Sequence, residues 1–282
     1  MKLKALVAIS LFAVVSIHAD IIPITTFDQM DDEFNHCNES TLVIFDVDEV
    51  LITTEDHFIQ PHVGDLFHRF CRDAFKKAHS DEEREELSNN LSAAFTGPKR
   101  HLVEKEIPSK IKQLQDRGVK VIALTASPVG KYGRVESAER WRIEHLNGLG
   151  INFAPSFPSI DRHQLEAIKH PQMAPPVFEA GILFSIGHEK GVVLRHFLEM
   201  WGLQPTKVVF IDDLMENLQS VEKELANSGI EFKGYLYKGA EPFFKELNLE
   251  LLHYQLDHLK NNGEWLSDIE VAQRLFLHTY GN

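Results

Sequence analysis

Short, wholly apolar runs alternate along the chain with longer stretches in which apolar residues recur every three or four positions. The run at residues 42–45 contains no polar residue, which is typical of a strand buried on both faces of a sheet. Similar runs at 119–124 and 208–211 predict two more such strands, and another strand is predicted near 232–237. We therefore expect a central sheet that is covered on both sides.

Helical periodicity fills the intervals between these runs. Residues 63–78 place their apolar positions on a single stripe, and a strongly charged helix follows over 81–95. Further helices are predicted up to Arg117, over 135–146, from 191 to 201, up to about 227, and twice after Pro242. Strands that alternate with helices form parallel sheets with right-handed crossovers, so the predicted fold class is α/β.

The N-terminus has the pattern of an export signal. Lys2 and Lys4 precede an apolar run at 5–17, and Ala19 supplies a small residue for cleavage. The run is too short to span a bilayer comfortably, and no later segment qualifies. We expect a signal peptide at 1–19 and an exported protein, periplasmic or secreted, without stable membrane association after cleavage. An uncleaved anchor is the alternative.

The charge and the cysteine content of the chain limit what it can bind and which covalent cross-links it can form. The 42 acidic and 29 basic residues give a formal charge of −13, which disfavours binding to a nucleic-acid backbone. The chain has two cysteines, Cys37 and Cys71, which can form one disulfide in an oxidising compartment; two free thiols fit the sequence equally well. Nothing in the sequence indicates a protein partner.

Three of the apolar runs end in residues that can do chemistry. The first leads into Asp46 and Asp48, the second into Thr125, and the third into Asp212 and Asp213. In parallel sheets, ligands bind beyond the carboxyl ends of the strands, so these side chains should meet at one edge. Four clustered carboxylates repel one another unless a cation balances them. Mg²⁺ suits such a donor set and is typical of phosphoryl chemistry.

The spacing of the first acid pair suits a two-step displacement. A carboxylate such as Asp46 can attack phosphorus and form an aspartyl-phosphate. Asp48, two residues on, lies on the same side of the strand end and can protonate the leaving oxygen and then activate water.

The segments "VIFDVDEVL", "VIALTAS", "HEKGVVLRHFL" and "VVFIDDLMENL" together resemble the four ordered motifs of the haloacid dehalogenase-like superfamily. The resemblance spans about residues 42 to 220. It implies a Rossmann-like core with helices on both faces and a Mg²⁺-dependent phosphohydrolase activity. Together with the export signal, the motifs are similar to those of the secreted acid phosphatases of this superfamily.

Roles for the acids follow from this resemblance. Asp46 would be the nucleophile and a metal ligand. Asp48 would be the general acid/base and would bind the metal through its backbone carbonyl. Asp213 matches the metal-binding acid of the last motif, with Asp212 as second ligand or outer-shell partner. Alternatively, one of these last two acids caps the following helix. Asn217 either touches this site or lies on the helix surface.

The remaining motif residues would bind phosphate. Thr125 would hydrogen-bond it, and Lys190 would neutralise the intermediate and hold Asp46 in place. The alternatives are an ordinary strand-end hydroxyl and a solvated lysine at a helix start. Two positions depart from the family pattern, because Glu49 and Val50 stand where many relatives have Gly and Thr. The acid at 48 favours phosphoryl transfer over halide displacement.

The domain organisation follows from the motif spacing. The interval between the first two motifs is longer than a simple crossover needs, so we expect a small helical cap at 57–99 that controls access and excludes water. The core would comprise 20–56 and 100–240. Residues 241–282 would form a C-terminal helical extension, with no role that can be argued beyond packing.

The prediction from sequence is therefore an exported, Mg²⁺-dependent phosphatase. Its substrate would be a small-molecule phosphomonoester, hydrolysed through a covalent intermediate on Asp46. A phosphotransferase or mutase is the enzymatic alternative. The non-enzymatic alternative is an exported binding module that uses the same scaffold without catalysis. The clustered acids argue against this last alternative, because a pure scaffold has no physical need for them.

Overall fold

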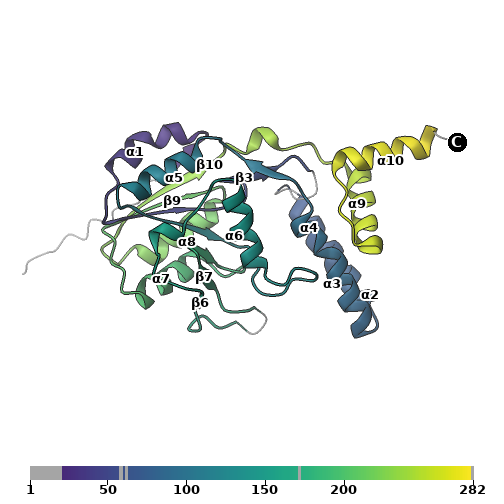
Figure 1. Ribbon diagram of the computed structural model, residues 1–282, viewed down its shortest axis with the longest axis horizontal. Coiled ribbons are helices and arrows are strands. Elements are labelled where there is room, and N and C mark those ends of the chain that lie inside the picture. Colours follow the sequence, from purple (N-terminus) through teal and green to yellow (C-terminus); the bar gives the residue numbers. More distant parts are fainter. Residues whose placement is uncertain (1–20, 57–59, 61–62, 171–172, 281–282) are drawn as a thin grey trace, which may run out of the picture.

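The computed structural model describes residues 21–56, 60, 63–170 and 173–280, so the predicted signal peptide lies outside the described residues. An eight-stranded sheet forms the centre of the molecule (Figure 1). Its order is β1 (Ile21–Ile24), β10 (Glu231–Tyr237), β9 (Lys207–Asp212), β2 (Thr41–Phe45), β5 (Lys120–Thr125), β8 (Ile182–Phe184), β7 (Val177–Glu179) and β6 (His163–Gln164).

The first six strands of this order pair in parallel, and β7 pairs antiparallel with both of its neighbours, β8 and β6. The inner strands β9, β2 and β5 are the apolar runs of the sequence, and all five residues of β2 are buried. Val43 and Phe45 belong to the hydrophobic cluster on one face, whereas Leu42 and Ile44 belong to the cluster on the other. The predicted α/β fold with a largely parallel sheet, buried on both faces, is confirmed.

Helices cover both faces of the sheet. The short 3₁₀ helix η1 (Phe27–Met30), α1 (Asp31–His36), α5 (Ile107–Asp116) and α6 (Ala138–Gly148) contribute to the cluster around Val43. Helices α7 (Lys190–Met200) and α8 (Met215–Leu225) contribute to the cluster around Leu42. The core is thus a three-layer arrangement with its inner strand ends available to carry a site.

A separate helical unit stands beside the sheet (Figure 1). The chain leaves the core through β3 (Ile52–Thr54) and returns through β4 (Arg100–Leu102), and these strands pair as a two-stranded antiparallel sheet. Between them lie α2 (Gly64–Lys77), α3 (Asp81–Leu91) and α4 (Ala93–Thr96). We call these three helices the cap; the charged segment predicted as one helix over 81–95 is two helices.

The C-terminal helices α9 (Leu249–Asn262) and α10 (Asp268–Tyr280) lie at the cap end of the molecule, and α9 contacts α3 (Figure 1). One hydrophobic cluster combines residues from both segments of the chain: Val63, Leu87, Leu91, Ala94, Leu252, Leu256 and Leu259. The C-terminal extension therefore supplies three of these seven buried residues of the cap interior.

Arg134, in the loop between β5 and α6, ties the core to both segments of this unit. Its backbone N–H donates to Ser92 Oγ (3.1 Å). Its guanidinium donates to the Asn90 side-chain oxygen (2.9 Å) and to the Gly263 carbonyl (3.1 Å). The cap is consequently held against the core by hydrogen bonds from the backbone and side chain of one residue, as well as by its chain connections.

The two cysteines lie in different hydrophobic clusters. Cys37 is buried in the core cluster beside α1, and Cys71 packs against the cap cluster. Both thiols are free, so the disulfide alternative is wrong. Burial raises the pKa of each thiol to about 11, which keeps both protonated and unreactive at neutral pH.

In the described part of the chain, every helix falls short of the length and hydrophobicity that a membrane span requires.

Candidate active site

The site is built at the carboxyl ends of two neighbouring strands. Asp46 directly follows β2, and its backbone N–H donates to the Ile211 carbonyl of β9 (2.9 Å). This bond extends the ladder between the two strands by one residue and places Asp46 beside Asp212, the last residue of β9. Both side chains are buried, Asp212 completely.

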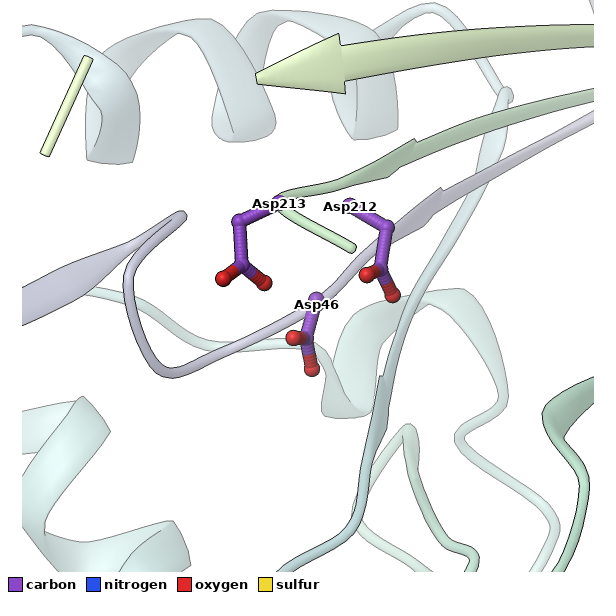
Figure 2. A group of neighbouring side chains, drawn as sticks. All are labelled: Asp46, Asp212 and Asp213. Atoms are coloured by element: carbon purple, nitrogen blue, oxygen red, sulfur yellow. The ribbon is translucent and has the colours of Figure 1, made fainter. Parts of the chain in front are cut away.

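Three of the four predicted acids converge at this edge. Carboxylate oxygens of Asp46, Asp212 and Asp213 all lie within 4.8 Å of one another. Figure 2 shows the three side chains grouped around one space, with Asp46 just after the end of β2 and the other two at the end of the neighbouring strand β9. Carboxylate oxygens in such a group are the donors that hard divalent cations prefer.

Lys190 joins this group from the first turn of α7. Its Nζ lies 2.8 Å from Asp46 Oδ1 and donates to Asp212 Oδ2 at 2.7 Å. The residue is only 3% exposed, so the alternative of a solvated lysine is excluded. The ammonium is held between the two buried carboxylates and orients both.

The charge of the group is not balanced by protein residues alone. Burial raises the pKa of Asp46 well above its ordinary value; Lys190 opposes this rise, and Asp212 and Asp213 add to it. Burial, reinforced by Asp212, raises the pKa of Asp213 to about 7. Burial alone would lower the pKa of Lys190, but the carboxylates of Asp46 and Asp212 raise it. Three ionised carboxylates and one ammonium leave a net charge of −2.

The two acids at the end of β9 have different tasks. Asp212 Oδ1 accepts hydrogen bonds from the Leu214 backbone N–H and from Asn217 Nδ2, both at 2.9 Å. With Lys190 on its other oxygen, Asp212 is fixed on both sides and organises the entry into α8. Asn217 therefore touches the site through Asp212. Asp213 is only half-buried and is the more accessible acid of the pair.

Asp48 does not share this grouping through its side chain. Its carboxylate pairs with Arg142 of α6, with Nη1 3.1 Å from Oδ1 and Nη2 donating to Oδ2 at 3.1 Å. The Asp48 side chain is 47% exposed, whereas that of Arg142 is 3% exposed. A metal contact from Asp48 is therefore left to its backbone carbonyl, as the family resemblance implied, and stays a prediction.

Thr125 closes β5 on the other side of β2. Its hydroxyl donates to Ser127 Oγ (3.1 Å) and accepts from the Ser127 backbone N–H (3.2 Å). The Ser185 backbone N–H donates to the Thr125 carbonyl (2.7 Å), which links the ends of β5 and β8. Thr125 thus lies buried at the same sheet edge, and its role toward phosphate stays a prediction.

The departure at Glu49 has a backbone consequence. Glu49 has φ +62°, a left-handed conformation that favours glycine and that costs a side-chain-bearing residue about 1 kcal/mol. Two hydrogen bonds hold it: its N–H donates to the Ile52 carbonyl (2.8 Å), and Thr53 Oγ1 donates to its carboxylate (2.7 Å). Burial raises the pKa of Glu49 to about 7. Val50, where many relatives have Thr, is fully buried in the core.

Arg142 is the residue of the site that the sequence reasoning missed. On α6 the buried positions include Ala138, Arg142 and Leu146, four residues apart. Residues four apart lie on the same face of a helix. A charged residue between a small and an apolar one on that face was therefore the signal in the sequence that Arg142 is buried. An arginine on a buried face needs an anionic partner, and Asp48 is that partner.

Residues 23–272 match the model of a family described as "Protein of unknown function (DUF2608)". The chain belongs to this family. The DUF2608 match runs from β1 into α10, so it includes the sheet, the cap and the C-terminal helices.

Several relatives of this chain come from Rickettsia and Chlamydia. One uncharacterized protein of Rickettsia prowazekii is 22% identical over 92% of both chains, and a second is 23% identical over 94% of both chains. A putative outer membrane protein of Chlamydia pneumoniae is 26% identical over 49% of this chain and 47% of its own length.

Proposed function

We propose that this chain is a phosphatase that hydrolyses a phosphomonoester with Asp46 as nucleophile. The observation that carries the proposal is the contact between the buried Asp46 carboxylate and Lys190, beside two further acids at the carboxyl edge of a parallel sheet. The ammonium holds one Asp46 oxygen and leaves the carboxylate oriented for attack. The ordered resemblance to the haloacid dehalogenase-like motifs supports the same chemistry.

The reaction would take place in two displacements. In the first, an Asp46 oxygen attacks phosphorus, the bond to the leaving oxygen breaks, and Asp48 gives that oxygen a proton. In the second, Asp48 removes a proton from water, which attacks the phosphorus and releases inorganic phosphate and the Asp46 carboxylate. Lys190 offsets negative charge at Asp46 throughout, and the Thr125 hydroxyl is the proposed donor to phosphate.

The donor set fits a magnesium ion. Its members are oxygen atoms, and the net charge of −2 that the three ionised carboxylates and Lys190 carry together would be balanced by the +2 of the cation. Asp46 and Asp213 would hold it directly, Asp212 would act as second ligand or from the outer shell, and the Asp48 carbonyl would complete the protein ligands. When bound, the cation would neutralise charge on the phosphoryl oxygens.

We place the protein outside the cytoplasm, in the periplasm or secreted. The sequence pattern at 1–19 supports export, and the printed name of the Chlamydia relative is consistent with it. The acidic surface and a capped site favour a small-molecule substrate, because the cap restricts access and excludes water.

The deciding experiment measures hydrolysis of p-nitrophenyl phosphate with Mg²⁺ by the wild type and by Asp46→Asn. We expect Asp46→Asn to lose roughly 10⁴-fold in kcat, because removal of a nucleophile abolishes the covalent route. Asp32→Asn is the matched control, since it makes the same chemical change at a side chain that is 96% exposed. Circular dichroism of each variant establishes that it is folded.

Equal, background-level rates for the wild type and Asp46→Asn would refute the phosphatase and favour a binding module. An added alcohol acceptor separates hydrolysis from transfer, because a phosphotransferase would yield the alkyl phosphate at the expense of inorganic phosphate.

A further inference from the structure

Both Nη atoms of Arg142 lie 3.1 Å from a carboxylate oxygen of Asp48; Nη2 donates a hydrogen bond to Oδ2, and Nη1 makes an ion-pair contact with Oδ1. The planar fork of arginine fixes the plane of a carboxylate as well as its distance, which a lysine ammonium does not do. The two side chains differ in exposure: that of Arg142 is 3% exposed and that of Asp48 is 47% exposed. Arg142 thus holds Asp48 from the buried side and leaves its other side accessible.

Aromatic rings fix the guanidinium in turn. Its central carbon lies 5.5 Å from the ring centroid of Phe95 and 5.6 Å from that of Trp141. The two rings are themselves in contact, with centroids 4.6 Å apart. Phe95 belongs to α4 of the cap and Trp141 to α6 of the core. Arg142 therefore lies where the cap meets the core.

Asp48 is the counter-charge that this arginine requires. A second guanidinium, that of Arg100, also lies over the Trp141 ring at 5.6 Å and repels Arg142. Within the described residues, Arg142 Nε and Nη1 are both buried without a hydrogen-bond partner, so the ion pair with Asp48 is what compensates Nη1. Burying a guanidinium is unfavourable unless a carboxylate compensates for the lost water, so the geometry of Arg142 is tied to Asp48.

We propose that Arg142 is a positioning residue for Asp48, and that the cap contributes to this positioning through Phe95. The inference rests on the proposed phosphatase function, in which Asp48 protonates the leaving oxygen. Arg142 touches neither substrate nor phosphorus. It sets the direction from which the Asp48 carboxylate meets the leaving group.

This role makes a prediction that depends on the leaving group. An alkoxide needs a proton as its bond to phosphorus breaks, whereas a nitrophenolate leaves readily without one. Misplacement of the acid should therefore harm an alkyl phosphate more than an activated aryl phosphate. The parameter to compare is kcat/KM, because it reports the steps up to formation of the aspartyl-phosphate and excludes its later hydrolysis.

The experiment measures kcat/KM for p-nitrophenyl phosphate and for a simple alkyl phosphate with wild type, Arg142→Gln and Arg142→Lys. We expect Arg142→Gln to lose about 10²-fold on the alkyl phosphate and only a few-fold on the aryl phosphate. Arg142→Lys, which keeps the charge without the fork, should fall between Arg142→Gln and the wild type. Arg140→Gln is the matched control, since Arg140 lies on the same helix with its side chain 70% exposed.

A double-mutant cycle completes the test. Asp48→Asn should show the same leaving-group dependence, and Arg142→Gln should add little to it, because both changes remove one function.

Equal losses on the two substrates for both Arg142 variants, or additive losses in the cycle, would overturn the positioning role while leaving the phosphatase intact. Wild-type rates no higher than those of Asp46→Asn on either substrate would overturn the proposed function and this inference with it.

Discussion

Strand β9 carries a buried charge cluster at each end, and the two clusters are built on opposite principles. At its amino end, the single carboxylate of Glu33 contacts Lys207 and Lys233 and accepts a hydrogen bond from Tyr235 Oη (3.1 Å). At its carboxyl end, three carboxylates share the single ammonium of Lys190. The buried carboxylate of the first cluster has two cations beside it, whereas the three carboxylates of the second share one.

The ionisation of the acids follows this difference. Burial would raise the pKa of Glu33, but hydrogen bonds from Lys207 and Lys233 outweigh it and hold the pKa below its ordinary value. Burial raises the pKa of Asp46 and of Asp213, and in these cases one lysine is insufficient to reverse the shift. Burial alone therefore does not distinguish a structural ion pair from a candidate active site; the unmatched charge does.

The largest effect is expected from removing the counter-charge of the acid group. Lys190→Met leaves buried carboxylates without a cation and should cost about 3–5 kcal/mol of unfolding free energy at pH 8. The loss should be smaller at pH 5, because carboxylates with raised pKa values are then protonated in the folded state. Urea unfolding at the two pH values measures it.

Lys207→Met is the matched control, because Glu33 keeps Lys233 in that variant. An equal loss of stability for Lys190→Met at pH 5 and pH 8 would contradict the account of unmatched charge.

A smaller effect is expected from magnesium and pH acting together. Since the pKa of Asp213 is raised from 3.8 to about 7, the metal-free protein should lose stability as pH rises through this interval and then level off. A cation at 100 times its dissociation constant adds about 2.7 kcal/mol. The rise in Tm on adding MgCl₂ should therefore be greater at pH 8 than at pH 5.5.

Asp213→Asn should weaken the pH dependence, to which Asp46 and Glu49 also contribute, and remove the magnesium response while leaving the metal-free protein at least as stable at pH 8. A magnesium-induced rise in Tm that persists in Asp213→Asn would place the cation elsewhere.

The smallest effect is expected at the other end of β9. Glu33→Gln leaves two partly exposed lysines that water can hydrate, so we expect a loss of about 1–2 kcal/mol at pH 7 with kcat unchanged. Because the pKa of Glu33 is lowered, its contribution is present above pH 4.5 and is lost as pH falls below that value. The unfolding free energies of wild type and variant should accordingly converge as the pH falls below 4.5.

Glu231→Gln is the control, since Glu231 also contacts Lys207 but its side chain is 63% exposed. It should change the unfolding free energy by less than about 0.5 kcal/mol. A fall in kcat for Glu33→Gln would show that the two ends of the strand are coupled.

The inner strands could be predicted because the sequence of each strand alone shows that it is a strand. β2, β5 and β9 are runs of consecutive apolar residues, and only a strand buried on both faces uses such a run. The sequences of the outer strands give a weaker signal of strand structure. β1 has only four residues and includes Pro23, which lacks the N–H of an inner strand and is tolerated at the sheet edge. β6 and β7, with two and three residues, are too short for any period to show.

The candidate site likewise has a part that the sequence predicts and a part that it does not. Asp46 and Asp212 follow predicted parallel strands, so topology alone brings them to one edge. The contact between Asp48 and Arg142 joins positions 94 residues apart, and neither neighbouring sequence encodes it. The junction of α9 with α3 was equally hidden, because an amphipathic helix does not state which surface will cover its apolar face.

The apolar interior of the cap is built from two segments that are far apart in the sequence, and this affects when the cap can fold during synthesis. Leu87 and Leu91 leave the ribosome long before Leu252, Leu256 and Leu259, which complete their hydrophobic surroundings. Until the last helices are translated, the first cap segment has no permanent cover for its apolar face. The late synthesis of α9 thus delays completion of the apolar interior of the cap.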